Sequence, residues 1–251
     1  IKICGITRPE DAVAAKELGA DYLGLILSQG FPRSILPDEA VEIGLVAEAP
    51  LVAVLVDESL DEAERIAGLS GVSVIQLHGE EDGEYAEELR RRGKWAIWKA
   101  VRVRDPEDVT RAVEAVGASV DGLLLDGWHS DRPGGSGVSF SWGSVRVLRD
   151  RIPHDLKVIA AGGLTPGNVA DAVQALRPDI VDVSSGVELH VRRKDPELIR
   201  AFVRNARGGG WGGSSGFWSL WHVSYLILVP LKRVLQLMTR WFFCTYKKTQ
   251  N

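Results

Sequence analysis

The sequence is poor in cysteine. Only Cys4 and Cys244 occur among 251 residues, too few and too far apart for the disulfide framework typical of small secreted domains. The first residues also lack the charged leader and apolar block of a signal peptide. We therefore expect a cytoplasmic protein whose thiols stay reduced.

Acidic residues are absent from the last part of the chain. Residues 208–251 hold five Lys/Arg and no Asp/Glu, which leaves 25 Lys/Arg against 34 Asp/Glu in residues 1–207. The acidic main part has no basic stripe, so we expect no nucleic-acid partner.

Several motifs of known chemistry are missing. The sequence has no His/Asp/Glu cluster at metal-ligand spacing, no Ser/His/Asp set in a nucleophile elbow and no dinucleotide-binding fingerprint. We therefore expect no metal and no cofactor. An enzyme that works with acid and base side chains remains.

Eight short apolar runs, rich in Val, Ile and Leu, recur along the chain. They span residues 1–4, 21–27, 51–56, 72–77, 95–100, 120–126, 157–161 and 180–185. Their continuous apolarity is typical of parallel strands covered on both faces. Helical patterns lie between them, as at 8–19, 61–69, 105–117, 166–176 and 195–206. This alternation predicts an α/β fold, a single (β/α)8 TIM barrel in about 207 residues, with an open doubly wound sheet as the alternative.

Local signals support the helices and the barrel. Thr7 with Glu10, and Ser59 with Glu62, fit the capping box that opens a helix. Polar side chains also recur where the predicted strands end. In a barrel, the carboxyl ends of all strands meet at one face. The residues are Cys4, His78, Lys99, Asp126, Ser184 and Ser185.

Two loops have the composition of a phosphate site. Gly162 and Gly163 come directly before Thr165 and Pro166, where we expect a helix to begin with unpaired amides. Ser184 and Ser185 end the next strand, and barrels commonly bind phosphate at the loops after strands 7 and 8. The alternative is that the glycines only permit tight turns.

A second glycine-rich stretch occupies residues 134–137, "GGSG", in the long loop after the sixth strand. Gly135 and Ser136 belong either to a plain flexible loop or to a mobile lid over a phosphorylated substrate.

Cys4 and Asp126 could form an acid–base pair across the mouth of a closed barrel. Asp126 ends the apolar run "GLLLD", where poor solvation would raise the pKa of its carboxyl. Each residue also has a structural interpretation: Cys4 as a small core side chain, and Asp126 as a cap for the next loop.

Three further residues have two interpretations each. Arg33, in "FPRS", could grip a carboxylate with both arms of its guanidinium or be a solvated loop charge. His78 could donate to a substrate oxygen or complete a turn. Lys99 could form a Schiff base, although a structural lysine paired with a carboxylate is the favoured interpretation.

The ordered motifs "KICGIT", "FPRSILP", "QLHGEE", "LLLDG", "GGSG", "AGGLTPGNV" and "VDVSSGVE" closely resemble those of phosphoribosylanthranilate isomerases of tryptophan biosynthesis. The resemblance spans residues 1 to about 207. It implies a single (β/α)8 barrel that converts N-(5-phosphoribosyl)anthranilate into the 1-deoxyribulose form by an Amadori rearrangement without a cofactor. It departs from the family pattern at "FPRS" and at "LHVRRKD", which lacks the common Pro-Gly.

The resemblance also implies roles for individual residues. Cys4 is the expected general base and Asp126 the expected general acid, and Arg33 is expected to hold the anthranilate carboxylate. The expected substrate-binding residues are Arg33, His78, Gly135, Ser136, Gly162, Gly163, Asp182, Ser184 and Ser185. The expected partner is a small phosphorylated substrate, membrane contact by the last residues of the chain is the disfavoured alternative, and the protein is expected to be a monomer or homodimer.

The end of the chain lies outside the resemblance. Residues 208–216 have the Gly/Ser content of a flexible linker. Residues 217–251 are aromatic and basic, and their uninterrupted apolar part ends at Pro230, too short for a membrane-spanning helix. We favour an extension without a selected role over an interfacial helix or a docking segment.

Two rival functions remain from the sequence. One is an inactive barrel that only binds a sugar phosphate. The other is a related isomerase or epimerase, which would be expected to use paired aspartates or a metal. Cys4 together with Asp126 favours the phosphoribosylanthranilate isomerase.

Overall fold

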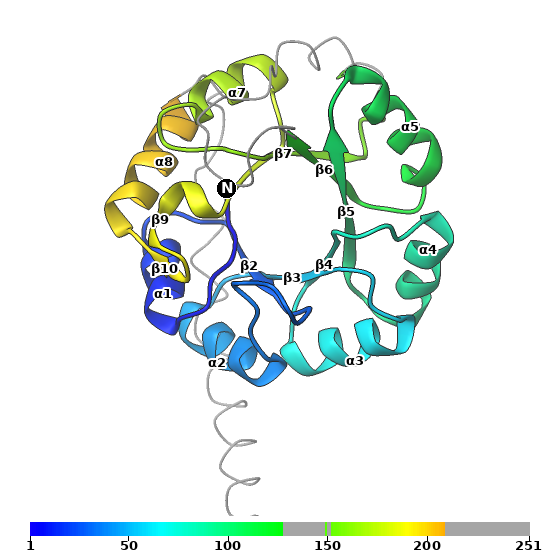
Figure 1. Cartoon of the computed structure of the whole chain (residues 1–251), viewed down its shortest axis with the longest axis horizontal. Coiled ribbons are helices and arrows are strands. Elements are labelled where there is room, and N and C mark those ends of the chain that lie inside the picture. The colour runs from blue at the N-terminus through cyan, green and yellow to red at the C-terminus, as the bar shows by residue number, and fades with distance from the viewer. Residues whose placement is uncertain (128–148, 150–151, 209–251) are drawn as a thin grey trace, which may run out of the picture. The chain divides into compact units, whose positions relative to one another are not determined.

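The computed structural model describes residues 1–127, 149 and 152–208. Within them, eight parallel strands close into a barrel in chain order, and β8 pairs with β1. The strands are β1 (Lys2–Ile3), β2 (Tyr22–Ile26), β3 (Leu51–Leu55), β4 (Val74–Leu77), β5 (Ala96–Val103), β6 (Gly122–Gly127), β7 (Lys157–Ala161) and β8 (Ile180–Val183). Figure 1 looks along the barrel, with the sheet as its inner ring. The predicted TIM barrel is confirmed, and the open sheet is wrong.

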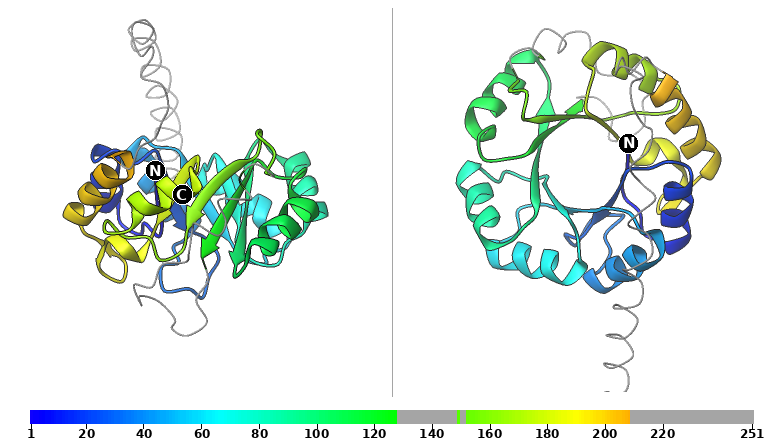
Figure 2. Two further views of the ribbon diagram at one scale, coloured as in Figure 1. Left: turned by 90° about the horizontal axis from the view of Figure 1, so that it is seen from above. Right: turned by 180° about the vertical axis from the view of Figure 1, so that it is seen from behind.

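Helices form the outer ring (Figure 1) and flank the strands on both sides in the turned view of Figure 2. In the described residues they are α1 (Pro9–Glu17), α2 (Pro37–Ala47), α3 (Leu60–Ser70), α4 (Gly83–Arg92), α5 (Pro106–Val116), α7 (Val169–Leu176) and α8 (Pro196–Gly208). The strands are buried from both sides, as β3 is at every position. This is why their sequences are continuously apolar.

The barrel interior has its own apolar cluster, separate from the layer between sheet and helices. Trp98 is fully buried in it and meets Tyr22 edge to face, with ring centroids 5.2 Å apart. Side chains alternate along a strand, so residues two positions beyond this cluster also face the interior. Gln76 follows Val74 in this way, and Asp126 follows Leu124. The cluster therefore forms the floor beneath the polar residues at the carboxyl ends of the strands.

All eight predicted strands are present, but several end elsewhere than predicted, and three of these differences bear on the site. β8 stops at Val183, so Ser184 and Ser185 follow the strand and Ser185 belongs to a 3₁₀ turn. β1 stops at Ile3, so Cys4 follows the strand. β5 continues to Val103 because it pairs with β6 as far as Gly127. Lys99 therefore lies in the middle of β5, and its predicted place at a strand end is wrong.

The helix starts were predicted less accurately. The Ser59 hydroxyl accepts a hydrogen bond from the Glu62 amide, which confirms the Ser59 half of the predicted capping box. The Thr7 cap is wrong, because the Thr7 hydroxyl donates instead to the Arg192 carbonyl and α1 begins without a side-chain cap. The helix expected from residue 166 begins only at Val169.

A short excursion between β8 and α8 was not predicted. A 3₁₀ turn, η2 (Ser185–Val187), leads into a two-stranded antiparallel hairpin of β9 (Glu188–His190) and β10 (Arg193–Lys194). Gly208 still belongs to α8. The predictions for Gly135, Ser136 and residues 209–251 lie outside the described residues. Across the ranges that are described, no helix is long and apolar enough to cross a membrane.

Candidate active site

A cavity of about 350 Å³ opens at the carboxyl ends of the strands. Eight of the residues predicted from the sequence line it: Cys4, His78, Asp126, Gly162, Gly163, Asp182, Ser184 and Ser185. Apolar side chains such as Phe31 and Leu124 line it as well. The fold therefore gathers residues from β1, β4, β6, β7 and β8 around one space.

Cys4 lies at the wall of this cavity, directly after β1. It is held by its own amide, which donates to the Val183 carbonyl at 2.8 Å, and its side chain is buried. Burial raises the pKa of the Cys4 thiol, and the charge of Lys2 is the strongest opposing influence. The thiolate is therefore not the resting form at neutral pH.

Asp126 faces the same cavity from β6. Burial and then the negative charge of Asp182 raise the pKa of Asp126 from 3.8 to about 6, against the opposing charge of Arg102. The raised pKa expected from the sequence is confirmed. A carboxyl that keeps its proton to near-neutral pH is suited to donate it to a substrate.

Gly162 has no side chain, and this leaves room for the carboxylate of Asp126. Its φ of +89° is one that glycine adopts readily, and a β-carbon there would stand 2.4 Å from Asp126 Oδ1. The glycine therefore serves the packing of the acid as well as the turn after β7.

His78 lies beside Asp126, with 3.8 Å between His78 Nε2 and Asp126 Oδ2. Burial lowers the pKa of His78 to about 4, so the ring is neutral at pH 7. The Gln76 amide nitrogen lies 2.9 Å from His78 Nδ1. An amide nitrogen only donates, so Nδ1 accepts and Nε2 carries the hydrogen that faces Asp126 and the cavity.

Asp182 has one oxygen engaged and one open. Its Oδ2 accepts a hydrogen bond from Lys2 Nζ at 2.9 Å, deep in the barrel. Its Oδ1 is buried without a hydrogen-bond partner in the described residues. Buried acceptors without partners are rare, so a ligand hydroxyl at this oxygen would complete the site.

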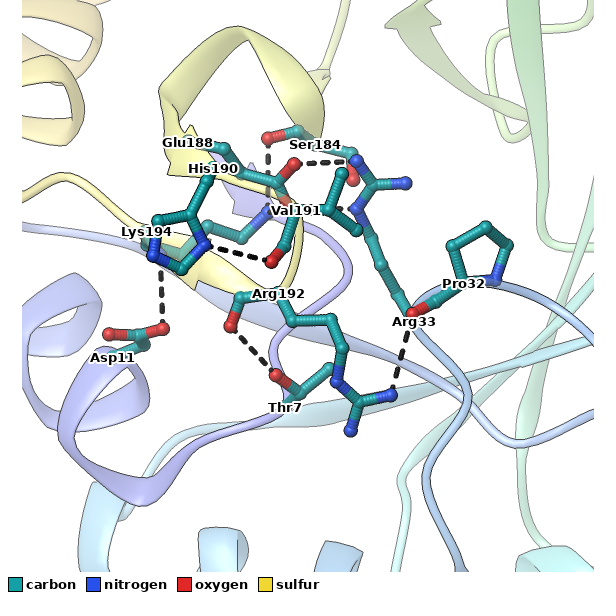
Figure 3. A network of polar contacts seen from close by, with 10 residues as sticks. All are labelled: Thr7, Asp11, Pro32, Arg33, Ser184, Glu188, His190, Val191, Arg192 and Lys194. Carbon is teal, nitrogen blue, oxygen red and sulfur yellow. Dashed lines mark hydrogen bonds and ion pairs between the residues drawn. The ribbon is translucent and has the colours of Figure 1, made fainter.

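Arg33 lies outside the lining of the cavity and is held by Glu188. Its Nε donates to Glu188 Oε1 at 2.7 Å and its Nη2 to Glu188 Oε2 at 2.5 Å. Lys194 Nζ also donates to Glu188 Oε1, at 3.0 Å. Figure 3 shows this network, in which Arg192 of the hairpin also reaches the Pro32 carbonyl. The hairpin thus fixes the loop that carries Arg33.

Lys99 has the structural role that the sequence favoured. Its ammonium contacts Glu81 Oε2 at 3.0 Å and the Gly79 carbonyl, which holds the loop after β4. Both side chains are almost fully buried. The amine is therefore engaged and does not face the cavity as a Schiff-base nucleophile would.

The loops after β7 and β8 share one end of the cavity. The predicted helix N-terminus is displaced, because the Thr165 amide is already bonded to Asn168 Oδ1 at 2.7 Å. Gly186 packs so closely on this loop that a β-carbon there would clash with the Leu164 carbonyl. The two glycine-rich loops therefore form one tight wall.

Sequence reasoning missed Lys2, Gln76, Glu188 and Lys194. All four are charged or polar side chains that the fold buries against partners. Of the four, only Gln76 in "QLHG" could have been found from the sequence. It precedes His78 by two residues, which places both side chains on the same face of a strand. In the described part of the chain, no group of three His, Cys, Asp or Glu side chains is placed to hold a metal ion.

Comparison with known proteins agrees with this arrangement. Residues 1–205 match the family model of N-(5'-phosphoribosyl)anthranilate (PRA) isomerase. The chain belongs to this family. An N-(5'-phosphoribosyl)anthranilate isomerase of Geobacter sp. is 41% identical over 211 residues, which are 82% of this chain and 97% of the relative.

Solved PRA isomerases have the same fold. The Thermotoga maritima crystal structure superposes with a TM-score of 0.75 at 36% identity, over 82% of this chain and 98% of that one. A PRA isomerase in complex with reduced 1-(o-carboxyphenylamino)-1-deoxyribulose 5-phosphate gives 0.72 at 34% identity, over 82% and 97%. The family predicted from the motifs is confirmed.

Proposed function

We propose that this barrel catalyses the Amadori rearrangement of N-(5'-phosphoribosyl)anthranilate in tryptophan biosynthesis, with Asp126 as general acid and Cys4 as general base. One observation carries the proposal. The Cys4 thiol, directly after β1, and the Asp126 carboxyl, on β6, line one cavity together with the loops after β7 and β8. Pure phosphate binding would need neither the thiol nor the carboxyl.

The reaction needs one proton given and one taken. Asp126 donates a proton to the ribose ring oxygen, the C1–O bond breaks, and the anthranilate nitrogen forms a protonated Schiff base with C1. Cys4 then removes the proton from C2, which leaves an enolamine. Protonation at C1 and loss of the hydroxyl proton give the ketone.

Asp126 and Cys4 are both protonated to some extent before substrate binds, which suits the acid directly and the base only once substrate is present. Asp126, with its pKa near 6, retains a protonated fraction at neutral pH. In the protein without substrate, burial raises the pKa of Cys4. The cationic Schiff base supplies the missing positive charge next to the sulfur when the proton at C2 must leave.

Substrate groups have a place at each end of the cavity. The phosphate lies against Gly162, Gly163, Ser184 and Ser185, whose loops offer amides and hydroxyls without bulky side chains. The open Oδ1 of Asp182 accepts a ribose hydroxyl, and His78 Nε2 donates to a substrate oxygen.

Arg33 is proposed to bind the anthranilate carboxylate. Glu188 occupies its Nε and Nη2, and within the residues described its Nη1 makes no hydrogen bond. A guanidinium whose position is fixed on one edge can still bind a carboxylate on the other. Gly135 and Ser136, in the segment that follows β6 in the sequence, are proposed to contact the phosphorylated substrate.

Organisation beyond the site is also a proposal. We assign residues 1–207 to the isomerase domain, 208–216 to a linker and 217–251 to an extension. A solved structure describes monomers generated from the dimeric T. maritima enzyme, and we propose a cytoplasmic monomer or homodimer here.

The full chain tests the proposal directly. N-(5'-phosphoribosyl)anthranilate is fluorescent, so its disappearance, with the ketone product identified by mass and by chromatography against a standard, measures turnover. Turnover that needs no added metal or cofactor is expected. Binding of the substrate without turnover would support the inactive barrel instead.

A further inference from the structure

Lys2 is a charged residue in an apolar place. It lies on β1 with its side chain inside the barrel, where its exposed fraction is 0%. Its strand neighbour in register on β8 is Asp182, and the two side chains form an ion pair of 2.9 Å. Removing two charges from water costs several kcal/mol per ion, and close pairing only partly offsets that.

Stability of the fold does not explain why Lys2 and Asp182 form a buried ion pair. A buried ion pair is weak evidence for stability, because apolar side chains of similar volume usually stabilise a core as well or better. The floor of the barrel interior is built from apolar residues such as Val52, Ile159 and Ile180. The charge at Lys2 therefore calls for a chemical reason.

Cys4 supplies that reason, because it lies two residues after Lys2, directly beyond β1, and its side chain faces the same way. Gly24, on the neighbouring strand β2, leaves the space that both side chains occupy. A β-carbon on Gly24 would stand 2.7 Å from Cys4 Sγ and 3.0 Å from Lys2 Cε. The sulfur and the end of the lysine chain are thus packed against the same bare stretch of backbone.

Four charged groups act on Cys4 from the elements around it. Lys2 on β1, Lys194 on β10 and Arg33 after β2 are positive, and Asp182 on β8 is negative. Lys194 and Arg33 are both engaged by Glu188. Among these influences, the Lys2 charge is the largest that favours the thiolate.

We propose that Lys2, held in place by Asp182, is a positioning residue that stabilises the thiolate of Cys4 when Cys4 acts as the base. Asp182 fixes the position of the Lys2 ammonium through their 2.9 Å ion pair, and the positive charge of Lys2 stabilises the ionised sulfur of Cys4 in a buried site. The inference rests on the proposed role of Cys4. Its test therefore measures the ionisation of the sulfur itself, which does not depend on turnover.

The thiol of Cys4 can be observed alone. The sequence has two cysteines, so a Cys244→Ser background leaves Cys4 as the only thiol. The ultraviolet absorbance of the thiolate, taken as a difference from the same protein with Cys4→Ser, gives the pH midpoint of ionisation. Lys2→Met is compared with Asp182→Asn and with Lys16→Met, a matched control at an exposed position on α1.

The two site variants should move the midpoint in opposite directions. Lys2→Met should raise it by about one unit or more, the usual effect of losing an opposite charge at close range. Asp182→Asn should lower it, because a negative neighbour is lost while the lysine remains. Lys16→Met should leave it unchanged. The pH limb of kcat/KM that reports Cys4 should shift with the midpoint.

A folded Lys2→Met protein with the midpoint of the parent would overturn the inference. If Lys2→Met leaves Asp182 unpaired and does not fold, the double variant Lys2→Met/Asp182→Asn removes both charges. Its midpoint should lie above that of Asp182→Asn alone, and equal midpoints would also overturn the inference. Near-normal turnover of Cys4→Ser would instead remove the proposed role of Cys4 as the general base.

Discussion

The carboxylate of Asp126 occupies the space that a side chain at residue 162 would need. A β-carbon on Gly162 would stand 2.4 Å from Asp126 Oδ1 and also 2.4 Å from the Gly127 amide nitrogen. The next glycine along, Gly163, also has a positive φ, but a β-carbon there would meet nothing within 4 Å. Substitutions at these two adjacent glycines therefore distinguish the effect of backbone strain from the effect of displacing the Asp126 carboxylate.

Gly162→Ala should lower kcat more than Gly163→Ala does. Both variants place alanine in the left-handed region, at a cost of about 1–2 kcal/mol in the free energy of unfolding. Only Gly162→Ala also pushes on Asp126. Urea unfolding and steady-state kinetics on both variants check this, and equal kcat values in the two would contradict the packing role of Gly162.

The pKa of Asp126 predicts a pH dependence of stability. Its pKa is about 6 in the folded protein against 3.8 ordinarily, so between these pH values the folded state holds a proton that the unfolded state has lost. The stabilising contribution is complete below about pH 4, is lost as the pH rises to about 6, and stays lost above that.

The comparison of wild type with Asp126→Asn isolates the contribution of Asp126 to the free energy of unfolding. Other titrating groups, such as His78, are present in both proteins and cancel in the difference. The free energy of unfolding of the wild type minus that of the variant should fall as the pH rises from about 4 to about 6.5. Urea unfolding across that range measures the difference. A difference that stays flat or grows with pH would show that Asp126 does not titrate as proposed.

The pair of Glu188 and Lys194 predicts a loss of stability. Lys194 is almost fully buried and its ammonium contacts Glu188 at 3.0 Å. Glu188→Gln leaves that buried cation without its counter-charge, and breaking a buried pair from one side typically costs about 3–5 kcal/mol. It also loosens Arg33, so KM should rise.

Glu197→Gln is the matched control. Glu197 pairs with Arg200 at 3.6 Å on the surface, with 80% of the Glu197 side chain exposed. Exposed pairs contribute about 0–1 kcal/mol, so this variant should unfold like the wild type. Similar losses in both variants, measured by urea unfolding, would argue against a special role of the buried pair.

The sequence predicted the parts of the molecule that depend on local pattern. Eight apolar runs became eight strands because each strand is covered on both faces. Cys4, His78 and Asp126 could be assigned to one mouth because the carboxyl ends of parallel strands meet at one face of a barrel.

Contacts between distant parts of the chain could not be predicted in the same way. Lys2 meets Asp182 across 180 positions, and nothing near either residue marks a charge as buried. Thr7 fitted a local capping pattern, but the Arg192 carbonyl, 185 positions away, takes its hydroxyl instead. Arg33 was expected to be open for a ligand, yet Glu188, on a hairpin without a sequence signal, holds one edge of it.

The central claim is that Cys4 and Asp126 act together on one substrate. The most direct measurement is kcat for loss of phosphoribosylanthranilate fluorescence in Cys4→Ser and Asp126→Asn. Cys244→Ser and Asp171→Asn, the latter exposed on α7, serve as matched controls. We predict a fall of at least ~100-fold in each of the first two, as is typical for a lost general acid or base, and near-normal kcat in the controls. A near-normal kcat in either Cys4→Ser or Asp126→Asn would contradict the account.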